Sequence, residues 1–212
     1  DRDGRLIASG RGVYFTADGN PLLTGCGTLF RTPAASDDLT YNGSLSAAPV
    51  VTAAADSATT RKLAVIPSSW SNPATADTEI QFYDDEFLRL LGRVPLPKYS
   101  TDVSWHGRNL FYNSDSTKLY LVLQADAAAA LSNDYAIYSL TLSTGAGCGA
   151  SLGAAAPSIP AAGGKVDVSV SAAAGCLWQA TPNANWLSID AGGIASGNAT
   201  VSIRAIPNLR SE

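Results

Sequence analysis

The sequence consists of short apolar or alternating runs that glycine, proline, asparagine and aspartate interrupt from end to end. Apolar residues almost never recur at helical spacing. Alternation with a period of two places successive side chains on opposite faces of a strand. The stretch 126–131, with four alanines, is interpreted as a loop or a single turn between strands. The sequence therefore predicts an all-β fold.

The amino-acid composition limits the classes of molecule that the protein can bind. Charged residues make up 15% of the 212 residues, and the net charge is −4. Without a basic patch the chain cannot neutralise phosphates, which argues against nucleic acid as a partner. No stretch reaches the roughly 20 apolar residues that a membrane span needs. A surface of small polar and neutral side chains is typical of secreted bacterial β proteins, so we expect a secreted or cell-surface location and a fragment of a longer protein.

Residues 1–145 contain a loose repeat of a strand-like run, an aspartate-centred turn and a second strand-like run. The copies cover 13–23 around Asp18, 50–66 around Asp56, and 110–122 around Asp115. Aspartate followed by glycine or serine suits tight turns, so each copy is predicted to form a β-hairpin. The second and third copies are followed by a further run that could pair in the same sheet, at 79–83 and 135–142.

Repeated four-stranded units of roughly 40 to 50 residues are the signature of a β-propeller. On this pattern residues 1–145 resemble the bacterial surface propellers of the YVTN and lactonase-like kind. The resemblance implies about three blades, fewer than the roughly four that a closed ring needs, and hence an open arc or the end of a longer ring. An irregular β-sandwich with similar turns is the alternative.

A glycine-containing joint at 143–147 precedes a second domain, 146–212, in which aromatic residues thin out. Residues 165–171 alternate strictly, with three valines on one face and polar residues on the other. Cys176 and Trp178 share a face by the same period, and 200–205 alternates again. Such half-buried strands between glycine and asparagine turns predict a β-sandwich.

Two cysteines lie in this second domain. A bridge between Cys148 and Cys176 would close a loop of about 29 residues and contribute about 3.5 kcal/mol in the chain-entropy description. It would also imply an oxidising compartment. Two isolated buried thiols are the alternative, and Cys26 is expected to be a small buried residue of the first domain. The sequence has no Cys-x-x-Cys pair and a single histidine, so no metal site is predicted.

The second domain resembles the BACON family, an immunoglobulin-like module of bacterial surface proteins and glycan-processing enzymes. The resemblance covers about 65 residues. It rests on Ala162-Gly163-Gly164, Val166-x-Val168-x-Val170, Gly175-Cys176-x-Trp178-x-Ala180, Asn185-Trp186-Leu187-x-Ile189, Gly197-Asn198-x-Thr200-Val201, Asn208 and Arg210. It implies a Cys148–Cys176 bridge and a spacer, anchor or glycan-binding role. The family continues into a further strand, so the last strand is expected to be missing and an edge unpaired.

No arrangement of residues in the sequence defines a catalytic site. The carboxylates are scattered, at Asp37-Asp38, Asp84-Asp85-Glu86, Asp102, Asp115 and Asp134. The 84–86 run is interpreted as a solvated hairpin tip, and His106 as a structural loop histidine because no nucleophile motif accompanies it. Nucleophile-elbow, phosphate-loop and dinucleotide motifs are absent, so no cofactor is predicted.

Exposed tryptophans are candidates for binding sugar faces. Trp178 shares a face with Cys176, and we expect both Trp178 and Trp186 to be core residues. Trp70 and Trp105 lie in or beside loops and are the predicted ligand-binding residues.

The leading hypothesis is an extracellular binding or spacer protein whose partner is a carbohydrate or another surface protein. A lactonase-like or glycan-degrading hydrolase, with the second domain as an accessory, is one alternative. A purely structural surface module is the other.

Overall fold

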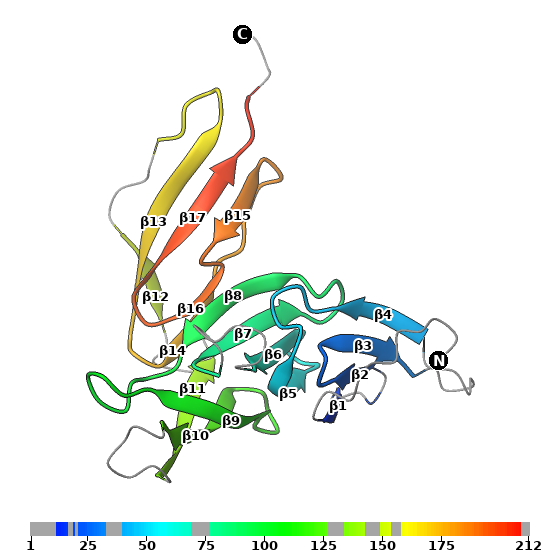
Figure 1. Cartoon of the computed structure of the whole chain (residues 1–212). Helices are drawn as coiled ribbons and strands as arrows, with labels where there is room; N and C mark the ends of the chain where they lie inside the picture. Colours follow the sequence, from blue (N-terminus) through cyan, green and yellow to red (C-terminus); the bar gives the residue numbers. More distant parts are fainter. Residues whose placement is uncertain are drawn as a thin grey trace. The chain divides into compact units, whose positions relative to one another are not determined.

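The computed structural model describes residues 12–16, 19, 21–32, 40–68, 77–126, 134–142, 149–153 and 158–208. Within these residues every regular element is a β-strand, so the predicted all-β class is confirmed (Figure 1). The chain divides into two compact units. Unit 1 comprises Asp1–Leu90 and Val94–Ser139, and unit 2 comprises Leu91–Arg93 and Leu140–Glu212. The expected boundary at 145/146 and the stretch 127–131 lie outside the described residues.

The first sheet of unit 1 is an antiparallel meander of four strands taken in chain order. Its strands are β1 (Val13–Phe15), β2 (Pro21–Thr24), β3 (Thr28–Arg31) and β4 (Thr40–Ser44). The hairpin predicted around Asp18 is confirmed as β1–β2, although Asp18 itself lies outside the described residues. The β2–β3 turn requires Gly27, which adopts a φ of 68° and whose missing methyl would lie 2.3 Å from the Ala48 carbonyl oxygen.

The second sheet repeats this order of neighbours. Its strands are β5 (Val51–Ser57), β6 (Lys62–Pro67), β7 (Glu79–Asp84) and β8 (Leu90–Pro95). The prediction that Asp56 centres the β5–β6 turn is wrong, because Asp56 lies in β5 opposite Leu63. The turn comprises 58–61 instead. The Ser57 hydroxyl accepts a bond from Thr60 N, and Arg61 supplies the left-handed φ of 53° that closes the turn.

The third sheet of unit 1 contains the hairpin predicted around Asp115. In unit 1 this sheet comprises β9 (Trp105–Tyr112), β10 (Lys118–Ala125) and the first part of β11 (Tyr135–Leu142), whose last three residues belong to unit 2. The turn at Asp115 is held by side chains, since Thr117 N donates to the Asp115 carboxylate and Lys118 N donates to the Asn113 amide oxygen. These are the local bonds for which such turn residues are selected.

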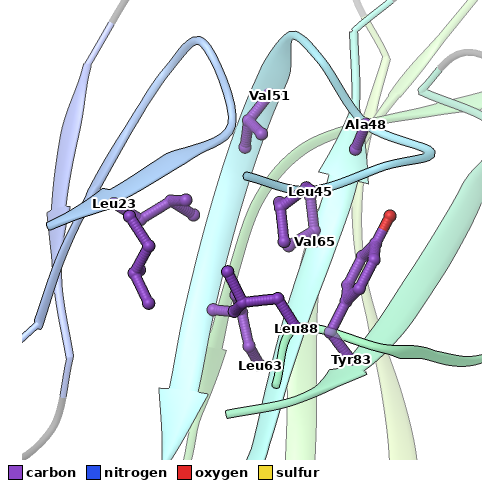
Figure 2. Packing of buried hydrophobic residues seen from close by; sticks show 9 residues of the cluster. Leu23, Leu45, Ala48, Val51, Leu63, Val65, Tyr83 and Leu88 are labelled. Atoms are coloured by element: carbon purple, nitrogen blue, oxygen red, sulfur yellow. The ribbon is translucent and has the colours of Figure 1, made fainter. Parts of the chain in front are cut away.

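The sheets of unit 1 stack on one another through apolar faces. Between the first and second sheets lies a core cluster, most of which Figure 2 labels. Its members are Leu23, Leu29, Leu45, Ala48, Val51, Leu63, Val65, Tyr83 and Leu88. On the other face of the second sheet β9 contacts β5 and β6 so closely that a methyl group on Gly107 would lie 2.6 Å from Ile66 Cδ1. The second sheet is thus covered on both sides.

Strand β7 carries three polar side chains into this core. Glu79, Gln81 and Tyr83 alternate with Ile80 and Phe82, and all five residues are buried. The Tyr83 hydroxyl donates to Gln81 Oε1 at 2.5 Å, and Gln81 Nε2 donates to Glu79 Oε1 at 2.7 Å. The three side chains therefore satisfy one another along a single face of the strand.

Unit 2 contains a second group of strands. They are β12 (Ala150–Leu152), β13 (Gly164–Ala172), β14 (Cys176–Gln179), β15 (Leu187–Ala191), β16 (Ile194–Ser196) and β17 (Ala199–Ala205). One sheet has the order β12-β13-β17-β15, with β13 and β17 antiparallel over seven residue pairs (Figure 1). Strand β14 pairs antiparallel with β16 and in parallel with Thr141 and Leu142.

Trp178 is at the centre of the core of unit 2. The predicted alternation of β13 is confirmed, since Val166, Val168 and Val170 are each more buried than their polar neighbours. Val170 packs with Trp178, Ala195 and Val201 in one cluster. The buried indole donates its N–H to the Gly197 carbonyl oxygen at 2.7 Å. The prediction that Trp178 is a core residue is confirmed.

Candidate functional site

The structure describes one of the two predicted ligand-binding tryptophans, Trp105. Trp70 lies outside the described residues, so a shared surface of the two stays a prediction. Trp105 is half-buried at the first position of β9, where its ring meets Tyr99 edge to face at a centroid distance of 4.9 Å. An indole packed against a neighbouring ring offers only part of its surface to a ligand.

His106, next to Trp105, belongs to a polar network around the buried Asp77 carboxylate. The prediction of a loop histidine is wrong, because His106 lies within β9 and pairs with Gln124 of β10. Its Nδ1 lies 2.6 Å from Asp77 Oδ1, and its Nε2 lies 3.4 Å from Asp126 Oδ2. Arg108 Nη1 donates to the second Asp77 oxygen at 2.8 Å.

Both ring nitrogens of His106 face carboxylates. The Asp77 side chain is only 8% exposed, and its residue holds a left-handed φ of 47°. An ionised carboxylate only accepts hydrogen bonds, so the ring nitrogen facing Asp77 donates. The other ring nitrogen faces a second carboxylate, that of Asp126. The two carboxylates therefore fix the orientation of the His106 ring.

A polar pocket of about 470 Å³ opens in unit 1. Its lining combines carboxylates, guanidinium groups, hydroxyls and an amide, from Thr16, Pro21, Arg31, Thr32, Asn42, Asp56, Ala58, Arg61, Asp85 and Glu86. Asp85 and Glu86 of the predicted hairpin tip at 84–86 line one side of the pocket. There Arg61 donates to Asp85 at 3.1 Å and to Glu86 at 3.3 Å, and the first of these bonds raises the pKa of Arg61.

Asp56 links this pocket to a buried tyrosine. Burial is the main reason why the pKa of the Tyr112 phenol is raised, and the negative charge of Asp56 adds to the rise. The Thr60 hydroxyl acts in the opposite direction. Burial and the neighbouring Asp56 carboxylate thus keep the Tyr112 phenol in its neutral form.

A groove of about 540 Å³ in unit 2 presents an exposed tryptophan. Eight residues line it: Ile159, Pro160, Ala161, Trp186, Ala205, Ile206, Pro207 and Asn208. The prediction that Trp186 is a core residue is wrong, because half of its surface is exposed. Trp186 precedes the first residue of β15, so the alternation of that strand does not turn its ring inward.

Backbone hydrogen bonds connect the segments that form the groove of Trp186. Ile206 N donates to the Trp186 carbonyl oxygen at 3.1 Å, and Asn208 N donates to that of Ala161 at 2.8 Å. These bonds join three segments far apart in the sequence. Concave apolar sites with a few polar groups are the usual form of small-ligand sites.

The structure describes two of the three cysteines, Cys26 and Cys176. Cys26 is half-buried in the β2–β3 turn rather than buried as expected. Cys176 is buried at the start of β14. Cys148 lies outside the described residues, so the Cys148–Cys176 pairing stays a prediction.

The chain matches no protein-family model, and no curated protein resembles it significantly. Across the described part of the chain, no helix has the length and apolar character needed to cross a membrane. In the same residues no group of three or more His, Cys, Asp or Glu side chains could hold a metal ion.

Proposed function

We propose that the protein is an extracytoplasmic binding protein that recognises a glycan or another surface polymer, and that the groove of Trp186 is its contact surface. The observation that carries the proposal is the half-exposed indole that forms a wall of this groove. An indole face packs well against the apolar face of a sugar ring, while groove amides and carbonyls can bond its hydroxyls.

The propeller-like and BACON-like architectures belong to the same proposal. Two four-stranded sheets with neighbours in chain order, and a third sheet that stacks on the second, support an arc of propeller blades in unit 1. In unit 2, support comes from the buried Trp178 behind a four-stranded sheet. A domain with exposed loops and a separate binding module in one chain would both suit the recognition of a polymer.

The extracytoplasmic location depends on the oxidised pair Cys148–Cys176. Mass spectrometry of peptides from natively purified protein, alkylated before digestion, tests it directly. We expect one cross-linked peptide pair with the mass of a disulfide. Alkylation of both thiols would contradict the pairing and remove this support for the location.

A glycan array with the whole chain, followed by calorimetry on the best ligand, tests binding. Trp186→Ala should weaken the affinity at least about tenfold, because truncating a stacking aromatic anchor costs more than about 1.4 kcal/mol. Leu152→Ala is the matched control, since Leu152 is an exposed apolar residue of unit 2 outside the groove. Trp105→Ala measures any contribution from unit 1.

Two results would overturn the proposal. One is an array on which the wild-type chain binds nothing, and the other is a Trp186→Ala variant with unchanged affinity. If the wild-type chain hydrolysed a bound glycan and the Asp56→Asn variant did not, the function would instead be catalysis in the polar pocket of unit 1.

A further inference from the structure

The first and third sheets of unit 1 each carry large exposed apolar side chains on the face turned away from the second sheet. In the first sheet one row runs across all four strands through the register pairs Phe15–Leu22, Leu22–Phe30 and Phe30–Tyr41. Phe15 is 69% and Tyr41 42% exposed at the two ends of the row, whereas Phe30 between them is buried. The opposite face carries Leu23 and Leu29 into the core cluster. Exposed apolar area of this kind marks interaction surfaces on soluble proteins.

The third sheet has the same two-sided character. Leu119, Leu121 and Leu123 of β10 are buried, whereas the residues between them face outward. Tyr120 on this outer face stacks on Phe111, with the two ring centroids 5.5 Å apart. Ala125 N bonds to the Asp134 carbonyl oxygen, and continuing that register places Ile137, which is 75% exposed, beside Val122.

The second sheet of unit 1 packs against another sheet on each of its two faces. One of its faces, with Leu63 and Val65, packs on the first sheet, and the other, with Ile66, packs on the third. The stack therefore has a direction, in which each sheet offers one face to the preceding sheet and the other to the following sheet. The outer face of the third sheet corresponds to the face with which the second sheet contacts the sheet that follows it. The outer face of the first sheet corresponds to the face with which the second sheet contacts the sheet that precedes it.

We propose that unit 1 of one copy of this chain packs head to tail on unit 1 of a second copy, the outer face of the third sheet receiving the outer face of the first. One chain carries both halves of this contact, and joining them repeats the packing found within the unit. Two different surfaces meet, so the interface is heterologous and can extend beyond a dimer.

Sedimentation velocity of the whole chain tests the proposal, from about 1 µM to about 1 mM, the range over which weak protein contacts saturate. The wild-type sedimentation coefficient should rise with concentration. Phe15→Lys and Ile137→Lys each block one face, so each alone should remain a monomer. An equimolar mixture of the two variants keeps one intact face of each kind and should form a dimer only. Phe87→Lys, at a residue 78% exposed in the β7–β8 turn, should behave as wild type.

Both variant positions are largely exposed, so the fold should survive, and matching circular dichroism and melting temperatures check this. Phe111→Ser is the second variant of the third-sheet face. A wild-type chain that stays monomeric at about 1 mM would overturn the proposal. So would a mixture that does not recover the dimer, or a Phe15→Lys variant that still associates.

Discussion

Replacing the buried Trp178 by phenylalanine should destabilise unit 2 by about 2 to 3 kcal/mol. The indole is 5% exposed, and its N–H donates to the Gly197 carbonyl oxygen at 2.7 Å. Phenylalanine removes that donor and leaves a buried acceptor unpaired, which costs about 1 to 2 kcal/mol. The smaller ring also leaves a void of roughly 40 Å³, and at about 24 cal/mol per Å³ this adds about 1 kcal/mol.

The assay is native-state hydrogen exchange of the amides of Val168 and Val201, which lie in the paired strands β13 and β17 and report on unit 2 alone. Trp186→Phe is the matched control. Since half of Trp186 is exposed, its replacement should cost less than about 0.5 kcal/mol. Equal losses in the two variants, or no loss in Trp178→Phe, would refute the assignment of Trp178 to the core of unit 2.

Three further predictions concern single side chains. Asp77→Ala should destabilise unit 1 by about 2 to 3 kcal/mol because it removes the buried acceptor of the His106 and Arg108 hydrogen bonds. Asp85→Ala breaks only a largely exposed ion pair and should cost less than about 1 kcal/mol, and urea unfolding compares the two variants. Hydrogen bonds from Arg204 and then Lys165 lower the pKa of Asp190 from 3.8 to about 2, so its contribution to stability is complete above pH 4 and is lost as the pH falls toward 2. Melting curves should show a smaller loss of stability over this interval in Asp190→Asn. Gly27→Ala should lower the melting temperature through a cost of about 2 to 4 kcal/mol, from a methyl group at a left-handed φ against a backbone carbonyl, and an unchanged melting temperature would contradict this.

Alternation and turn chemistry predicted the strands that have one buried face. The bounds of β11 follow from the sequence, and the valines of β13 point inward as expected. Strands β3 and β4 were not predicted, because each is short and β4 is polar and contains a glycine. Asp56 was placed in a turn on residue type alone. Strand pairing overrides that preference, and Arg61 takes the strained turn position instead.

The candidate sites depend on contacts that no local pattern records. Asp77 and His106 are separated by 29 positions in the chain, and only the folding of unit 1 brings them together. Trp186 has the apolar character of a core residue, and its position before β15 decides its exposure. The sequence offers one signal for this exposure: the alternating run begins at Leu187, so the alternation gives no reason to place the Trp186 ring in the core.

The buried polar side chains of β7 have a consequence for strand alignment. Where one face of a sheet meets water, a slip by one residue would expose the apolar set, and that penalty fixes the pairing. Strand β7 lacks this safeguard, since both of its faces are covered and all its residues from Glu79 to Tyr83 are buried. A slip by one residue would turn Glu79, Gln81 and Tyr83 together to the other face and would break the bond that Gln81 Nε2 donates to the Ala47 carbonyl oxygen at 3.4 Å. This bond to a neighbouring segment thus favours one alignment of a strand that has no solvent-exposed face.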